Sequence, residues 1–152
     1  MSLNYTKKTL DNFLKPKNIG KISKPDGYAQ IGNMSCGDQL DFFLKVEKGR
    51  IKDVKFLSFG CASNIATASI LTEKVKGMTI GAAKKYPWQK IVSELGGLPD
   101  QKVHCSVMAV QGLKKAIENY ESEEKKKKVK PLVKKKPKPL AKKKSVKKRL
   151  SI

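Results

Sequence analysis

The chain has 152 residues, with 34 Lys and Arg against 13 Asp and Glu and a formal net charge of +21. This length is typical of one domain, and no apolar run approaches the roughly 18 residues that a membrane span requires. The charge is uneven, because residues 121–152 carry 15 basic and 3 acidic residues, a net +12. We therefore expect a folded domain over residues 1–120 and a Lys-rich tail over residues 121–152.

The cysteine count and the N-terminus indicate the compartment. Three cysteines cannot all pair within one chain, and the sequence opens without an apolar signal segment or an Arg-rich transit peptide. These features favour a reducing environment over a secreted, disulfide-stapled protein. We expect a cytoplasmic protein without a membrane span.

Apolar side chains near the N-terminus recur at helical spacing. Ser2 or Asn4 can cap this helix, which Pro16 and Gly20 would end, and we expect it to lie across a sheet. Residues 40–46 and residues 51–59 then alternate apolar and polar side chains around a Lys48-Gly49 turn. This pattern predicts a β-hairpin with one buried face, to which residues 28–32 can add a third strand.

Helical patterns dominate the rest of the domain. Residues 62–76 predict a helix that ends at Gly77, and shorter helices are expected after a Thr79 cap and at Pro87, placed in a first helical position. A Gly-Gly-Leu-Pro loop over residues 96–99 precedes a last long helix. Its apolar stripe has a spacing of three and four residues, which defines one buried face: Ala109, Val110, Leu113, Ala116, Ile117 and Tyr120.

The composition of the Lys-rich tail predicts disorder. From Lys125 onward there are no acidic or aromatic residues, and so little apolar surface cannot offset the entropy of ordering the chain. Its positive charge would bind polyanions nonspecifically through counterion release. Three interpretations of the tail remain open. It could bind nucleic acid or ribosomes, it could bind an anionic membrane surface, or it could have no specific partner. A nucleic-acid-binding protein is the alternative function of another class, although residues 1–120 show no sequence-reading element.

Three cysteines lie at the boundaries of the expected elements. Cys36 precedes a strand, Cys61 lies between a strand and a helix, and Cys105 lies near the start of the last helix. Helix N-termini stabilise thiolates, so the pKa values of Cys61 and Cys105 are expected below the usual value of about 8.5. Asp38 follows Cys36 closely, and His104, the only histidine, adjoins Cys105.

Three thiolates with one carboxylate or imidazole would complete a site for zinc or for a [2Fe–2S] cluster. The spacing alone is weak evidence, because the chain has no Cys-x-x-Cys pair and convergence depends on the fold. The cysteines could equally be small buried apolar residues. Likewise, His104 could satisfy a core hydrogen bond, and Asp38 could anchor a turn.

Several motifs, taken as an ordered set, resemble the IscU/NifU-type iron–sulfur cluster assembly scaffolds over about residues 4–120. The opening helix and the segment over residues 15–20 belong to this resemblance. Its remaining motifs are Cys36-Gly37-Asp38, Phe59-Gly60-Cys61-Ala62, Leu98-Pro99 and His104-Cys105-Ser106.

The resemblance implies an α+β domain, with a three-stranded, mostly antiparallel sheet and helices on one face. It implies a scaffold rather than an enzyme, as a monomer or weak dimer. A cysteine desulfurase would supply sulfur, iron would bind, and a transient [2Fe–2S] cluster would pass to apo iron–sulfur proteins. Cys36, Cys61 and Cys105 would be thiolate ligands, with Cys105 the first sulfur acceptor. Asp38 and His104 would alternate in the fourth position, and Zn²⁺ could occupy the same site.

A related subgroup, the SufU-type zinc sulfurtransferases, provides the alternative. Those proteins resemble the scaffolds, with an extra segment between the second and third cysteines and no histidine before the third. The short interval from Cys61 to Cys105 and the presence of His104 favour the scaffold.

Two departures from the family pattern affect the expected partners. Many members read Leu-Pro-Pro-Val-Lys where an Hsp70-type chaperone docks, but residues 98–102 read Leu-Pro-Asp-Gln-Lys. Chaperone-assisted transfer is therefore doubtful. The Lys-rich tail also stands where some NifU-type proteins continue into further cluster-binding domains.

Overall fold

The computed structural model describes residues 5–33 and 37–133, with side chains up to residue 125. It divides into two units, with the boundary between Tyr120 and Glu121. Ser2, Asn4 and Cys36, all named above, lie outside the described residues. The elements are α1 (Lys7–Leu14), β1 (Gly27–Asn33), β2 (Asp38–Glu47), β3 (Arg50–Phe59), α2 (Ala62–Val75), α3 (Ile80–Lys84), α4 (Trp88–Glu94), a 3₁₀ turn (Asp100–Lys102) and α5 (Val103–Val133).

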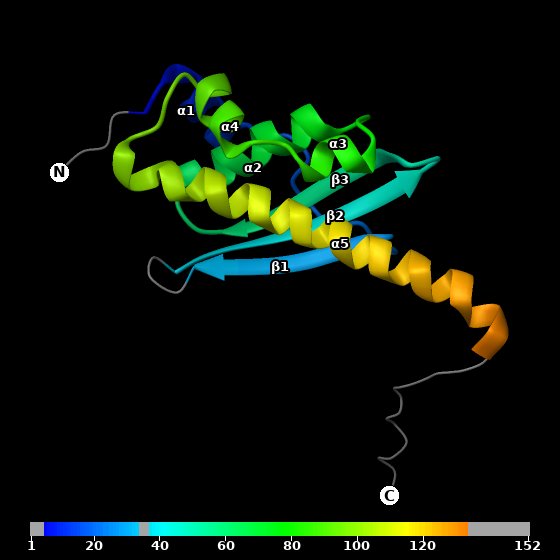
Figure 1. The fold of residues 1–152 in the computed structure, drawn as a ribbon. Helices are drawn as coiled ribbons and strands as arrows, with labels where there is room; N and C mark the ends of the chain where they lie inside the picture. The colour runs from blue at the N-terminus through cyan, green and yellow to red at the C-terminus, as the bar shows by residue number, and fades with distance from the viewer. Residues whose placement is uncertain (1–4, 34–36, 134–152) are drawn as a thin grey trace, which may run out of the picture. The chain divides into compact units, whose positions relative to one another are not determined.

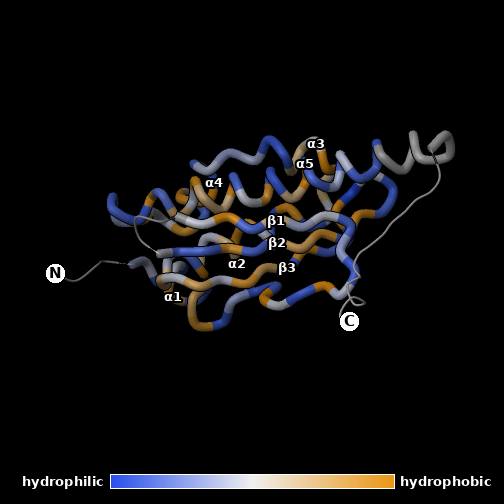
Figure 2. The backbone as a smooth tube through the Cα atoms, turned by 90° about the horizontal axis from the view of Figure 1, so that it is seen from below, coloured by the Kyte–Doolittle hydropathy of each residue, from blue (hydrophilic) through white to orange (hydrophobic). Residues whose placement is uncertain are grey.

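The sheet has three antiparallel strands in the order β1-β2-β3, with β2 in the centre (Figure 2). Lys48 and Gly49 join β2 to β3 with φ values of 54° and 74°. Two-residue hairpin turns need such positive φ values because they match the twist of the strands. The predicted hairpin and the third strand are confirmed.

The segment between α1 and β1 covers the outer edge of β3. The N–H of Gly20 donates to the carbonyl of Phe56 at 2.8 Å, and the N–H of Phe56 donates to the carbonyl of Asn18 at 3.0 Å. At Phe56 this edge therefore cannot pair with another chain. This contact also fixes the position of the chain as it leaves α1.

Helices cover one face of the sheet, which confirms the expected α+β class (Figure 1). Gly112 lets α5 lie close to the sheet, since a Cβ there would approach Ile31 Cγ2 and Phe42 Cε2 to 2.8 Å. The largest fully buried core side chains come from the strands, from α2, α4 and α5, and from the C-cap of α4, Leu95: Phe42, Phe56, Leu40, Leu44, Ile51, Leu71, Ile91, Leu95, Leu113, Ile117, Val54 and Val75.

The opposite face is more covered than the alternation predicts. Phe43 projects from this face of β2 and is nevertheless only 9% exposed. The Tyr28 ring lies 5.1 Å from it, centroid to centroid, on the neighbouring strand. The Tyr28 ring, itself 40% exposed, thus helps to cover Phe43 on a face without a covering helix.

The start and the packing of α1 differ from the expectation. Thr6 is the N-cap, because its side chain accepts a hydrogen bond from the N–H of Thr9. The helix packs chiefly on α2 rather than across the sheet: Asn12 accepts a hydrogen bond from Ser69 at 2.7 Å. Pro87 is likewise the N-cap of α4 rather than its first helical residue. In both cases the sequence predicts the helix correctly but places its start at a different residue.

The last helix extends beyond the expected start of disorder. α5 continues through Val133, past Lys125, and residues 134–152 lie outside the described residues. Glu and Lys are strong helix formers, so their local preference favours continuation of the helix. Among the described residues, no helix is both long and apolar enough to cross a membrane.

Candidate metal centre

Three predicted site residues converge at one end of the domain. Asp38 opens β2, Cys61 caps the start of α2, and Cys105 is in the first turn of α5. Their ligand atoms all lie within 4.8 Å of one another. Antiparallel pairing of Gln39 with Phe59 brings the start of β2 beside the end of β3, so the first two residues meet through sheet register.

The two sulfurs and one carboxylate oxygen form a compact triangle. Cys61 Sγ lies 3.9 Å from Cys105 Sγ, and Asp38 Oδ2 lies 3.8 Å from each sulfur. Cys105 and Asp38 are buried, while Cys61 is partly exposed. Thiolate and carboxylate donors in one cluster suit zinc and iron.

The Asp38 carboxylate lies against the turn that leads into α2. Its Oδ1 accepts a hydrogen bond from the N–H of Cys61 at 3.3 Å. Gly60 leaves the space for it, because a Cβ on Gly60 would clash with Asp38 Oδ1 and lie 2.8 Å from Asp38 Cγ and 2.5 Å from Asn64 Nδ2. The absence of a side chain at residue 60 is therefore required for this carboxylate position.

His104 lies at the edge of the same cluster. Its Nε2 is 3.8 Å from Cys105 Sγ and 3.9 Å from Asp38 Oδ2, and its side chain is 36% exposed. The structure thus brings together four of the five predicted residues, and Cys36 lies outside the described residues. Both the His104 imidazole and the Asp38 carboxylate therefore lie beside the same thiols. Which of the two binds a metal depends on the metal that is bound.

The two cysteines hold their protons unequally. A hydrogen bond with Cys105, assisted by Ser63 and the N–H of Asn64, lowers the pKa of Cys61 to about 5 against the opposing effect of burial. The same hydrogen bond with Cys61, followed by burial, raises the pKa of Cys105. The expectation of two lowered pKa values is wrong for Cys105, because a neighbouring thiolate opposes its ionisation.

The sequence analysis did not identify two residues that interact with this cluster, Ser63 and Lys102. Ser63 Oγ lies 3.1 Å from Cys61 Sγ and 3.2 Å from Cys105 Sγ. The negative charge of Cys61 raises the pKa of Lys102. The position of Ser63 in the sequence could have identified it. It lies two residues after the helix-capping Cys61, and side chains in a helix tilt toward its N-terminus.

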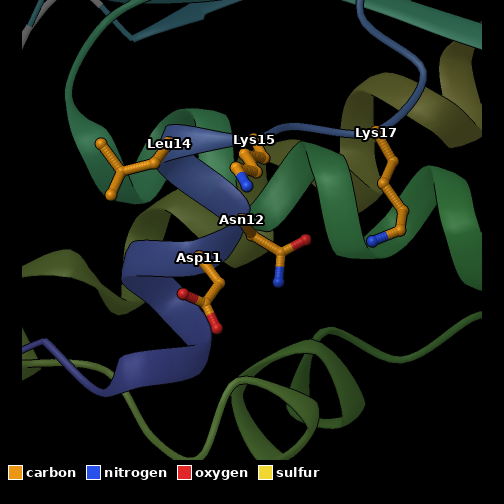
Figure 3. A pocket seen from close by; sticks show the side chains of 5 residues that line it. All are labelled: Asp11, Asn12, Leu14, Lys15 and Lys17. Atoms are coloured by element: carbon orange, nitrogen blue, oxygen red, sulfur yellow. The ribbon is translucent and has the colours of Figure 1, made fainter.

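A separate pocket of about 370 Å³ opens beside α1 (Figure 3). Asn12 projects toward α2 at this pocket, and none of the lining residues belongs to the sulfur cluster. The lining side chains are Asp11, Asn12, Leu14, Lys15 and Lys17. The pocket is thus distinct from the candidate metal centre.

The family model for the NifU-like N terminal domain matches residues 4–127, a span that includes the whole cluster. The chain belongs to this family. The predicted family resemblance is confirmed over most of the chain.

Curated relatives of similar length carry scaffold names. The iron–sulfur cluster assembly scaffold protein IscU 1 of Archaeoglobus fulgidus is 47% identical over 116 residues, covering 76% of each chain. The scaffold protein IscU of Aquifex aeolicus is 46% identical over 122 residues, covering 79% of this chain and 78% of the relative.

Solved structures share the fold at lower identity. The SufU protein of Fervidobacterium islandicum superposes with a TM-score of 0.65 and 24% identity, covering 74% of this chain and 96% of that chain. The N-terminal part of a NifU-like protein of Brucella abortus gives a TM-score of 0.63 and 21% identity, covering 78% and 94%.

Proposed function

We propose that this family member is an iron–sulfur cluster assembly scaffold, which accepts sulfur, binds iron and passes the finished cluster to apo-proteins. The observation that carries the proposal is the convergence of Asp38, Cys61 and Cys105 within 4.8 Å. Relatives at 46–47% identity bear that name over comparable lengths.

The ligand set of the proposal comprises Cys36, Cys61 and Cys105 as thiolates, with Asp38 and His104 as alternatives for the fourth position. The spacing between the described sulfurs supports a shared metal, since sulfurs 3.9 Å apart can both reach one tetrahedral ion at about 2.3 Å. The cargo is a [2Fe–2S] cluster, whose two irons need four protein ligands.

The donor chemistry supports temporary rather than permanent binding. A carboxylate or an imidazole is a harder ligand than a thiolate, so it weakens one corner of an iron–sulfur cluster. Cys61 is partly exposed and His104 is 36% exposed at the side chain, which gives the thiols of a recipient access to iron. An electron-transfer protein would instead enclose its cluster with four thiolates.

The proposed partners are a cysteine desulfurase and apo iron–sulfur proteins, and the free thiols of Cys61 and Cys105 support a reducing cytoplasm. Cys105 is the proposed first acceptor, and because its thiol is buried with a raised pKa in the metal-free chain, sulfur delivery requires the desulfurase to expose it. A persulfide on Cys105 would then lie beside Cys61, within reach of the same iron. Residues 98–102 lack the second proline and the valine of the chaperone-docking motif, so the proposal does not require an Hsp70-type partner.

The decisive test is anaerobic assembly with iron, cysteine and a cysteine desulfurase. We expect the absorption spectrum of a [2Fe–2S] cluster. Full cluster formation by a variant with all three cysteines changed to Ser would contradict the proposal. Loss of the spectrum in that variant, with retained helical content by circular dichroism, would support it.

The zinc-dependent sulfurtransferase is the second candidate, because the same Asp and Cys donors suit Zn²⁺. His104, 3.8 Å from Cys105 Sγ, favours the scaffold, since the SufU-type proteins lack a histidine before the third cysteine. Measurements on the zinc-loaded protein distinguish the sulfurtransferase from the scaffold. A sulfurtransferase would accelerate desulfurase turnover with zinc bound and would form no iron–sulfur chromophore, whereas a scaffold requires iron in place of zinc.

A further inference from the structure

The side chain of Ser63 lies between the two described cysteine sulfurs. Its Oγ is 3.1 Å from Cys61 Sγ and 3.2 Å from Cys105 Sγ, while the sulfurs themselves are 3.9 Å apart. Ser63 has no exposed surface, so bulk water does not compete for its hydroxyl. Among the described residues, both hydrogen bonds of this hydroxyl go to sulfur.

This placement differs from the usual role of a serine in the first turn of a helix. Such serines commonly satisfy free backbone N–H groups at the helix start. Ser63 lies in the first turn of α2, yet its side chain reaches across to Cys105 on α5. The hydroxyl therefore links two elements at the point where their sulfurs meet.

The chemistry of one hydroxyl limits what it can do there. A serine hydroxyl has one hydrogen to donate and two lone pairs to accept with. Without metal, it can accept from one thiol while donating to the other sulfur. Metal binding deprotonates both cysteines, and the hydroxyl hydrogen must then point to a ligand thiolate. Hydrogen bonds to thiolates shift charge away from sulfur and tune the bound metal.

We propose that Ser63 is a positioning residue of the metal centre, whose hydroxyl holds the sulfurs of Cys61 and Cys105 toward a common metal and donates a hydrogen bond to one of them. This inference rests on the proposed function, because it requires both cysteines to be ligands. It adds a residue outside the ligand set that sets both the geometry and the electron density of the thiolates.

The same helix provides a matched control. Ser69 is also fully buried on α2, but its hydroxyl donates to Asn12 at 2.7 Å and accepts from the N–H of Lys17 at 2.9 Å. Ser69→Ala therefore removes a buried hydroxyl from the α1 contact and leaves the sulfurs untouched. Alanine favours helix more than serine does, so both variants retain the helical preference of α2.

The test titrates the full metal-free chain with Co²⁺ under anaerobic conditions, since thiolate-to-cobalt charge-transfer absorption reports directly on the sulfurs. We expect Ser63→Ala to raise the Kd for Co²⁺ by about 10-fold or more, as loss of partners of metal ligands commonly does. We also expect its charge-transfer band at lower energy, because the thiolate loses a hydrogen-bond donor. Ser69→Ala should keep the affinity and the band of the unmodified chain.

Two results would overturn the inference alone: Ser63→Ala matching the unmodified chain in affinity and spectrum, or a weaker affinity with an unshifted band. The latter would indicate a role in folding only, which thermal unfolding of the same samples would also detect. Failure of the unmodified chain to give any thiolate-to-cobalt absorption would instead contradict the proposed ligand set, and this inference with it.

Discussion

The backbone N–H of Cys61 donates a hydrogen bond to the carboxylate of Asp38 across 3.3 Å, although 23 positions separate the two residues in the chain. The start of β2 and the end of β3 are neighbours in the antiparallel sheet, which brings these residues together. The carboxylate is thereby held 3.8 Å from both described cysteine sulfurs. One short turn thus determines the position of two candidate ligands.

Gly60→Ala should disrupt this turn. The added Cβ would clash with the Asp38 carboxylate and lie 2.5 Å from Asn64 Nδ2, both on buried side chains. We expect a loss of about 1–3 kcal/mol in the free energy of unfolding, typical of overpacking, together with weaker Co²⁺ binding. Urea denaturation and cobalt titration measure the two effects.

Gly81→Ala is the matched control for that variant. A Cβ at Gly81 meets no heavy atom within 4 Å, and the residue lies within α3. We expect it to stabilise the protein by up to about 1 kcal/mol through helix propensity, with unchanged cobalt binding. Equal effects of the two substitutions would show that the space beside Asp38 is unimportant.

Asp38→Ala should leave a cluster that forms but transfers more slowly. The carboxylate supplies the weakly held corner of the proposed cluster, so its removal leaves the more tightly binding donors. The rate at which apo-ferredoxin acquires its cluster measures the effect. Asp53→Ala is the control, because Asp53 pairs with Lys76 at 3.2 Å on a different part of the domain. Transfer from Asp38→Ala at the rate of the unmodified chain would contradict this labilising role.

Cys61 should react with alkylating agents differently from an ordinary cysteine. Its pKa of about 5 means that the thiolate predominates above that pH. We expect its alkylation by iodoacetamide in the metal-free protein to be nearly independent of pH between about pH 6 and pH 8. Peptide mapping by mass spectrometry follows each cysteine separately.

Cys105 provides an internal comparison in the same experiment. It is fully buried and its pKa is raised, so we expect little reaction over the same range. A Cys61 rate that rises about tenfold per pH unit would show an ordinary thiol and would contradict the inequality between the two cysteines.

Truncation after Tyr120 should separate cluster chemistry from polyanion binding. Residues 121–152 carry a net charge of +12 and contain none of the candidate ligands. We expect the shortened chain to assemble clusters normally and to lose retention on a polyanion column at low salt. Loss of cluster assembly would show that the domain extends beyond residue 120.

The order and type of the elements could be predicted because local signals agree with tertiary packing. Alternation identified both hairpin strands, and Lys48-Gly49 supplied the backbone conformation of their turn. Boundaries were less predictable. Thr6, rather than an earlier residue, caps α1, because its hydroxyl also donates to the carbonyl of Leu95 across the fold.

The site was predictable in its ligands but not in its environment. Family motifs identified Cys61 and Cys105 as ligands. The two residues are 44 positions apart in the chain, and this separation does not predict that their sulfurs lie 3.9 Å apart. Their unequal pKa values arise from that distance and could not be foreseen from helix N-termini alone. Ser63 was missed because its importance depends on how α5 lies beside α2.

Transfer of the cluster to an apo-protein is the most direct test of scaffold function. The chain is loaded anaerobically with its cluster, mixed with apo-ferredoxin, separated and analysed by absorption and iron content over time. We expect ferredoxin to gain a [2Fe–2S] cluster as this chain loses its own, and the chain then to be reloadable. A chain that keeps its cluster while the ferredoxin remains in the apo form would contradict a role as a transfer scaffold.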